Sequence, residues 1–111
     1  MNVQITRGPT ARRTVRFILI DPEAQEVFLA GSFNNWNPTK TPLTDIGHGH
    51  WVAEVVLPSG HHEYQFVVDG RWIHDRSASR LVDNPFGGIN SVVEIDGSVR
   101  NSSSQTNPAP V

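Results

Sequence analysis

Two tryptophans occupy positions in which an indole could contact a ligand. Trp36 comes shortly after the apolar run Val27–Ala30, which has the composition of a strand and is followed by Gly-Ser. The residues just before it are Asn34 and Asn35, and Asn tolerates the left-handed conformations that a tight turn needs. The turn is therefore expected to aim the Trp36 indole outward, where it could stack on a ring with an apolar face. Covering the end of the fold is the alternative role.

Trp72 follows a predicted hairpin loop, Asp69-Gly70, in which both positions tolerate positive φ. With this loop, Val68, Val67, Phe66 and Gln65 lie opposite Arg71, Trp72, Ile73 and His74. Because side chains alternate across a strand, Tyr64, Phe66 and Ile73 share the inner face, and Gln65, Val67, Trp72 and His74 share the outer one. An exposed Trp leaves apolar area in water at about 25 cal/mol per Å², which favours a ligand there, although such a residue can also cover a sheet face.

The third tryptophan, Trp51, is expected in the core. It begins the run 51–57, in which the charged Glu54 marks the outer face. The alternation then turns Trp51, Ala53, Val55 and Leu57 inward. Trp51 is therefore not a candidate for ligand binding.

The histidines and aspartates form no pattern typical of metal binding or catalysis. The residues concerned are His48, His50, His61, His62, Asp69, Asp75 and Asp83. The histidines lie in turns without a third ligand at metal-site spacing. Turn and edge roles account for the aspartates, since the sequence places no second carboxylate across a cleft. We therefore expect no metal, no cofactor and no catalytic residue.

Length and charge restrict the function further. A chain of 111 residues holds one domain, whereas a (β/α)₈ hydrolase barrel needs roughly 250, so we do not expect an enzyme. A net charge of -2 favours a neutral ligand over nucleic acid or an anionic membrane. The sequence has no cysteine, no apolar leader and no long apolar run, which makes a cytoplasmic location the expectation.

The apolar pattern predicts an all-β fold. Short β-branched and aromatic runs recur between Gly, Pro, Asn and Asp clusters, without a sustained helical period. The predicted strands are 14–20, 26–32, 51–57, 61–68, 71–74 and 91–95, with a weaker candidate at 40–44. Such strands predict an antiparallel sandwich of two sheets. Residues 1–9 are then an N-terminal arm, 10–96 the folded domain, and 97–111 a disordered tail rich in Ser, Asn, Gln and Pro.

Three segments carry a resemblance to a known family. They read VFLAGSFNNW (27–36), LPSGHHEYQFVVDGRW (57–72) and NPFGGINSVVEI (84–95). In this order they resemble the early-set carbohydrate-binding modules of family 48, found in the AMP-activated protein kinase β subunit and before the barrels of debranching and branching enzymes. The resemblance implies an immunoglobulin-like (early-set) antiparallel β-sandwich of about seven strands that binds α-glucan.

The resemblance also implies a set of binding residues. Two tryptophans of the family stack on glucose rings, and they match Trp36 and Trp72. A lysine of the kinase-type members matches Gln65, which keeps hydrogen bonding but loses the charge. A loop in which leucine, threonine and asparagine touch sugar matches Phe86, Gly88 and Asn90, and of these Asn90 alone is retained. The implied carbohydrate-binding residues are Trp36, Trp72, Asn90, Gln65 and Phe86.

The sequence thus predicts non-catalytic binding of an α-glucan, such as glycogen, starch or a maltooligosaccharide, by aromatic stacking. It further suggests a protein partner, supplying catalysis or signalling, that the module targets to glycogen. The alternative is a protein-interaction module on the same fold, with degenerate sugar binding, that docks through an outer face including Trp72 and Val67.

Overall fold

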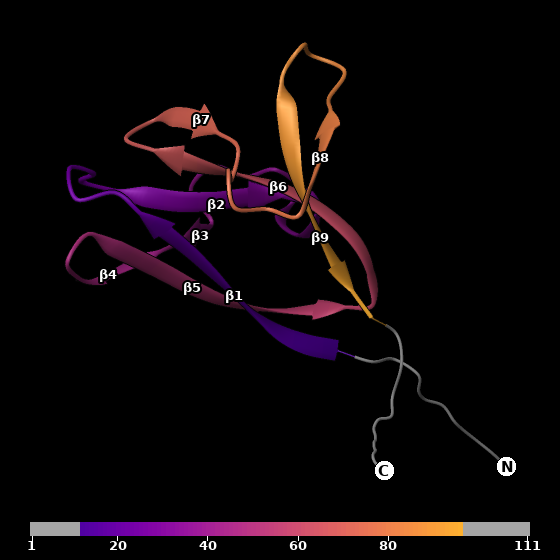
Figure 1. The fold of residues 1–111 in the computed structure, drawn as a ribbon, viewed down its shortest axis with the longest axis horizontal. Coiled ribbons are helices and arrows are strands. Elements are labelled where there is room, and N and C mark those ends of the chain that lie inside the picture. The colour runs from indigo at the N-terminus through magenta and orange to yellow at the C-terminus, as the bar shows by residue number, and fades with distance from the viewer. Residues whose placement is uncertain (1–11, 97–111) are drawn as a thin grey trace, which may run out of the picture.

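The computed structural model describes residues 12–96, which form an all-β fold of antiparallel strands in two sheets (Figure 1). The predicted arm and tail lie outside the described residues. The strands are β1 (Arg12–Ile20), β2 (Val27–Gly31), β3 (Thr41–Pro42), β4 (Thr44–Gly47), β5 (His50–Pro58), β6 (Gly60–Val68), β7 (Arg71–Ile73), β8 (Arg80–Asp83) and β9 (Ile89–Ile95), with one 3-10 turn, η2 (Ser32–Asn34). Within residues 12–96 no helix is long and apolar enough to cross a membrane.

The described residues contain nine strands, where the sequence predicted about seven. The weaker candidate at 40–44 divides into β3 and part of β4. Strand β8 was not predicted, because its four residues are mostly exposed and show no clean alternation. Its extended state depends on pairing with β9, which is a tertiary contact rather than a local preference.

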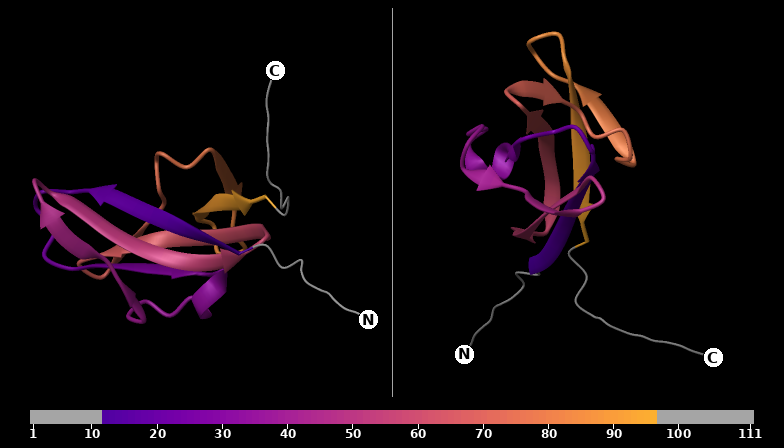
Figure 2. Two further views of the ribbon diagram at one scale, coloured as in Figure 1. Left: turned by 90° about the horizontal axis from the view of Figure 1, so that it is seen from below. Right: turned by 90° about the vertical axis from the view of Figure 1, so that its left-hand side faces the viewer.

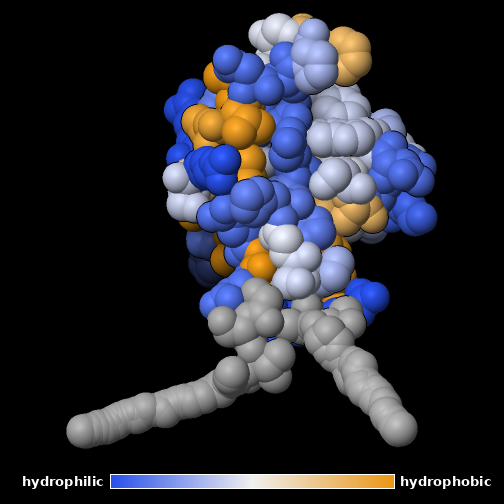
Figure 3. Space-filling model, turned by 90° about the vertical axis from the view of Figure 1, so that its right-hand side faces the viewer, coloured by the Kyte–Doolittle hydropathy of each residue, from blue (hydrophilic) through white to orange (hydrophobic). Residues whose placement is uncertain are grey.

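The two sheets share one core between them. The smaller sheet has the order β1-β5-β4, and the larger has the order β3-β2-β6-β9-β8, with β7 also paired to β6. The hairpin of β8 and β9 projects from the body of the fold (Figures 1 and 2). On the face in Figure 3, the described hydrophobic residues form separate areas among hydrophilic ones.

The core confirms the predicted parity of β5. Trp51, Ala53 and Leu57 are buried, whereas Glu54 and Val56 on the opposite face are exposed. Trp51 is 8% exposed, and its Nε1 donates a hydrogen bond to the Asp21 carbonyl at 3.1 Å. A buried indole with a partner for its N–H is a structural residue.

The hairpin register is confirmed for three of its four predicted pairs. Val68, Val67 and Phe66 pair with Arg71, Trp72 and Ile73. The loop has positive φ at both positions, 49° at Asp69 and 84° at Gly70. The predicted pair of Gln65 with His74 was wrong, because β7 ends at Ile73.

Val67 corrects the expectation of an exposed outer face. It lies on that face by register but is only 4% exposed. The reason is that β6 is an inner strand here, so Val67 has Phe28 of β2 on one side and Trp72 of β7 on the other. Two aromatic neighbours on the same face cover the smaller side chain.

Candidate functional site

A groove of about 480 Å³ lies on the outer face of the larger sheet. It is lined by Trp36, Glu63, Gln65, Trp72, Asn84, Pro85, Phe86 and Asn90. All five residues predicted from the sequence are among these, although they come from four separate parts of the chain. The fold therefore assembles one concave surface from the predicted residues.

The groove lies where one edge of β6 changes partner. β9 pairs with β6 up to Tyr64, and β7 pairs with it from Phe66 onward on the same edge. Gln65 falls between these two ladders and is half-buried. The Gln65 side chain lines the groove together with Trp72 and Asn90, and its Nε2 donates a hydrogen bond to Asn90 Oδ1.

The turn that presents Trp36 is held by buried contacts. Asn34 is 7% exposed, accepts a hydrogen bond from the Gly31 N–H, and donates to the Leu29 carbonyl and to Thr41 Oγ1. The backbone N–H of Trp36 in turn donates a hydrogen bond to the Gly31 carbonyl at 2.9 Å. Gly31 has no space for a side chain, since a Cβ there would lie 2.6 Å from the Glu63 carbonyl oxygen.

Trp36 itself adopts an uncommon backbone conformation. Its φ is 56° and that of Asn35 is 59°, both in the left-handed region. For residues other than Gly, Asn and Asp this region costs roughly 1–2 kcal/mol. The surrounding hydrogen bonds therefore hold the indole in place against a local backbone preference.

The two indoles form adjacent parts of one surface. Their ring centroids are 6.5 Å apart and their planes are inclined by 31°. A ring held between two parallel indoles would need about 7–8 Å, since each carbon contact takes about 3.5–4.0 Å. The pair is therefore too close to enclose a ring and instead offers a bent apolar platform. Trp72 is 44% exposed, as the hairpin register predicted, and Trp36 is half-buried.

Asn90 organises the polar side of the groove. It is 5% exposed, and its Oδ1 accepts hydrogen bonds from Gln65 Nε2 at 2.8 Å and Asn84 Nδ2 at 3.2 Å. Its Nδ2 donates to Glu63 Oε1 at 2.9 Å. Since an amide has two donor hydrogens and two acceptor lone pairs, Asn90 retains one donor with respect to residues 12–96. Counting contacts within the same residues, the amide of Gln65 retains one donor and its whole acceptor.

Phe86 stands at the tip of the loop between β8 and β9. The loop is closed by Asn84, whose Oδ1 accepts hydrogen bonds from the Phe86 and Gly88 N–H groups. Phe86 is 93% exposed although it lines the groove. An exposed phenyl ring beside an apolar platform is typical of a surface that a ligand covers.

Three further residues line the groove that the sequence did not predict, namely Glu63, Asn84 and Pro85. Glu63 carried a usable signal, because it has the same strand parity as Gln65 on β6 and so must share its face. Asn84 and Pro85 lie in a loop, where no periodicity indicates direction. Among the described lining residues Glu63 alone carries a charge.

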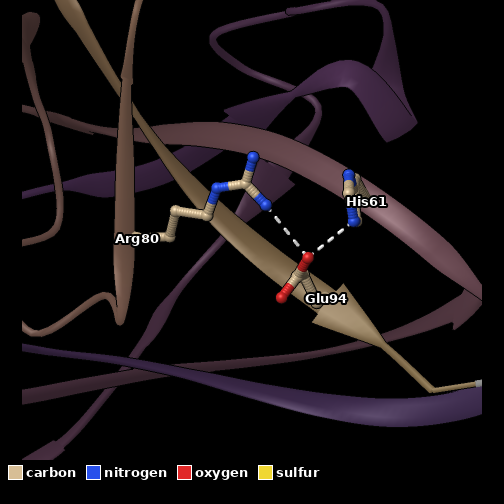
Figure 4. Close-up of polar contacts among 3 residues, drawn as sticks. All are labelled: His61, Arg80 and Glu94. Atoms are coloured by element: carbon tan, nitrogen blue, oxygen red, sulfur yellow. Dashed lines mark hydrogen bonds and ion pairs between the residues drawn. The ribbon is translucent and has the colours of Figure 1, made fainter.

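Three other ionisable side chains on this face of the sheet form a cluster of their own. Glu94 Oε2 lies 2.5 Å from His61 Nε2 and 3.1 Å from Arg80 Nη1 (Figure 4). These side chains are all more than half exposed. Among residues 12–96 no group of three or more His, Cys, Asp or Glu side chains could hold a metal ion.

A second, larger hollow of about 880 Å³ adjoins the groove, and the two share Gln65 and Trp72. Its other walls come from β1, the end of β7 and the loops that follow β7 and β8. Ile18, Ile20 and Ile89 line it and are 40–63% exposed. Trp72 thus lies between a groove with amide side chains and a second hollow that combines exposed isoleucines with the polar side chains of residues 74–77.

Comparison with known proteins identifies the family. Residues 16–101 match the family described as the glycogen recognition site of AMP-activated protein kinase. The chain is 41% identical over 87 residues to the 5'-AMP-activated protein kinase subunit beta-2 of Rattus norvegicus, covering 78% of this chain and 31% of that protein. It is 45% identical over 71 residues to subunit beta-1 of Sus scrofa, covering 64% of this chain and 55% of that sequence. The chain thus spans only part of these relatives. It belongs to the family of glycogen recognition sites of AMP-activated protein kinase, the glycogen-binding modules of the family 48 type.

Proposed function

We propose that this module binds α-1,4-linked glucan in the groove by stacking glucose rings on Trp36 and Trp72. The observation that carries the proposal is the bent indole platform, bordered by Gln65, Asn90 and Phe86. The faces of a glucose ring are rich in C–H groups, which an indole desolvates, while the hydroxyls at the ring edge stay available for hydrogen bonds. A bent platform suits α-glucan because the chain itself is curved.

Two amide side chains, Gln65 and Asn90, form the polar border of the groove and bind glucan hydroxyls in this proposal. Gln65 offers a free acceptor and a free donor to hydroxyls, and Asn90 offers its remaining donor. Because Asn90 also fixes Gln65, its loss would weaken binding by two routes. Phe86 adds an apolar contact at the open end of the groove.

Titration calorimetry with maltoheptaose tests the stacking. Trp36→Ala and Trp72→Ala should each weaken binding about tenfold or more, since a nucleic-acid base stacked on one aromatic side chain contributes roughly 1–3 kcal/mol and we expect a sugar ring on an indole to fall in this range. The double variant should show no binding. Ile46→Ala is the matched control, because Ile46 is 55% exposed on β4 in the other sheet and should leave the affinity unchanged. Equal affinities of the wild type and the double variant would contradict the proposal.

The module's role toward a partner is a separate part of the proposal. The relatives are named as subunits of a kinase, which supports a module that brings a protein partner to glycogen. One observation favours the interaction-module alternative, the exposed isoleucines of the second hollow beside the edge strand β1. The burial of Val67 counts against it, because that side chain is not available to a partner. Retention on amylose resin separates the two: the glucan proposal requires retention that the tryptophan double variant lacks, and the alternative requires none.

A further inference from the structure

Glu63 is the charged residue among the described lining of the groove, and the glucan proposal gives it no role. It lies on β6, two residues before Gln65 and on the same face. Its main chain is fixed to the turn of Trp36: the Glu63 N–H donates to Ser32 Oγ at 3.1 Å, and Ser32 Oγ donates to the Glu63 carbonyl at 3.4 Å. Its side chain lines the same groove as the two indoles, and its Oε1 accepts a hydrogen bond from Asn90 Nδ2.

The carboxylate of Glu63 is only partly used. Its Oε1 accepts one hydrogen bond from Asn90 Nδ2, and within residues 12–96 it forms no ion pair. Glu94 offers the contrast on the same sheet face, since Arg80 and His61 both contact its carboxylate (Figure 4). An ionised carboxylate accepts about four hydrogen bonds, so Glu63 retains free acceptor positions in a groove that otherwise holds neutral side chains.

We propose that Glu63 accepts hydrogen bonds from glucan hydroxyls and makes the groove selective for uncharged glucan over phosphorylated glucan. Each glucose unit carries neighbouring hydroxyls that can both donate to one carboxylate. Hydrogen bonds with an ionised acceptor are roughly twice as strong as neutral ones. The same charge repels a phosphate monoester, which carries about −1.5 to −2 charges at neutral pH. This inference rests on the proposed glucan binding.

Glu63→Gln tests the inference with little change of shape. A glutamine carbonyl accepts the hydrogen bond from Asn90 as the carboxylate does, so the groove should keep its geometry. We expect the variant to bind maltoheptaose about fivefold more weakly, which corresponds to the roughly 1 kcal/mol difference between charged and neutral acceptors. Glu94→Gln removes the same charge from the same sheet face outside the groove, and it should change the affinity less than twofold.

The decisive readout is the ratio of the affinities for maltoheptaose and for maltoheptaose with one 6-phosphate. At low salt the wild type should prefer the neutral sugar at least fivefold, and Glu63→Gln should lose most of this preference. The wild-type preference should also shrink at high salt, because screening shortens the range of the repulsion. A general loss of folding would not alter this ratio.

The outcomes separate this inference from the proposed function. If the wild type binds maltoheptaose through the tryptophans but Glu63→Gln keeps both the affinity and the full preference, the role of Glu63 is refuted and glucan binding stands. If the wild type shows no preference at low salt, the selectivity is refuted. If the wild type does not bind maltoheptaose, both proposals fall.

Discussion

The turns that present Trp36 and Trp72 reach the same groove by different physical means. The Asp69-Gly70 loop consists of two residues that adopt positive φ readily, and it joins two strands that pair directly. The turn before Trp36 depends on Asn34, which is buried against β2 and β3, and on the close approach of Gly31 to β6. A local loop sets the direction of Trp72, whereas contacts between separate strands set the direction of Trp36.

Among the variants that test this difference between the turns, Gly31→Ala should lose the most stability. The added Cβ would meet the Glu63 carbonyl oxygen at 2.6 Å, and a backbone atom of a paired strand cannot move away freely. We expect a loss of about 2–3 kcal/mol in the free energy of unfolding, as for overpacked cores. Urea denaturation measures this loss, and glucan affinity should fall with it because Trp36 is bonded to Gly31.

Gly70→Ala is the matched control in the other turn. A Cβ there meets nothing within 4 Å, but φ is +84°. The cost should be about 1 kcal/mol, from the backbone conformation alone. If the two variants lost equal stability, tertiary crowding at Gly31 would not be the difference between the turns.

Asn34→Ala should cause the next largest loss in the free energy of unfolding. It removes three hydrogen bonds and leaves the Gly31 N–H and the Leu29 carbonyl without their side-chain partner in a buried place. The expected loss in unfolding free energy is about 2 kcal/mol, the usual cost of an unsatisfied buried group. Asn37→Ala tests an exposed Asn of the same segment, whose contacts are local to Thr39, and it should cost less than about 0.5 kcal/mol by urea denaturation. The reverse order would refute the assignment of the turn to Asn34.

High pH should lower the free energy of unfolding through Tyr64, which lies on β6 opposite the start of the Trp36 turn. Tyr64 pairs with Gly31, is 4% exposed, and donates a hydrogen bond to Asp75 Oδ2 at 2.7 Å. Burial, together with the hydrogen bond and negative charge of Asp75, raises the pKa of Tyr64 well above its ordinary value. An unfolded Tyr loses its proton near pH 10 while native Tyr64 keeps it, so the unfolded state binds fewer protons and stability falls as pH rises above about 10.

The size of this effect follows from the same linkage. Between pH 10 and 11 the tyrosine should account for a loss approaching about 1.4 kcal/mol per pH unit. Urea denaturation of the wild type and of Tyr64→Phe over this range measures it, since other groups titrate equally in both. Parallel pH profiles would show that Tyr64 ionises as readily in the native protein as in the unfolded chain.

Asp69→Ala, in the Asp69-Gly70 loop, should cause the smallest loss of stability. The Asp69 carboxylate accepts hydrogen bonds from the Gln25 and Glu26 N–H groups, but all of these residues are exposed. We expect a loss of about 1 kcal/mol, part of it from the positive φ that alanine adopts less readily. Asp69→Asn keeps this backbone tolerance and should recover part of the loss in a thermal melt. Full recovery would show that the negative charge contributes nothing, because an asparagine carbonyl can accept the same two hydrogen bonds.

The sequence predicted those features whose causes lie within a few residues. Strand alternation assigned Trp51 to the core, and the two-residue loop gave the pairs of Val67 with Trp72 and Phe66 with Ile73. Three short motifs were sufficient for the family and for five residues that line one groove. All of these follow from local spacing or from resemblance.

The tertiary structure decided what depends on residues far apart in the chain. The burial of Val67, the strand state of β8 and the end of β7 before His74 come from neighbouring strands that local patterns do not specify. The same holds for the network in which Asn90 joins Gln65, Asn84 and Glu63, because those residues lie up to 27 positions away. Period-two alternation gives the face on which a side chain lies, but only the packed sheet determines what covers it and which partners it meets.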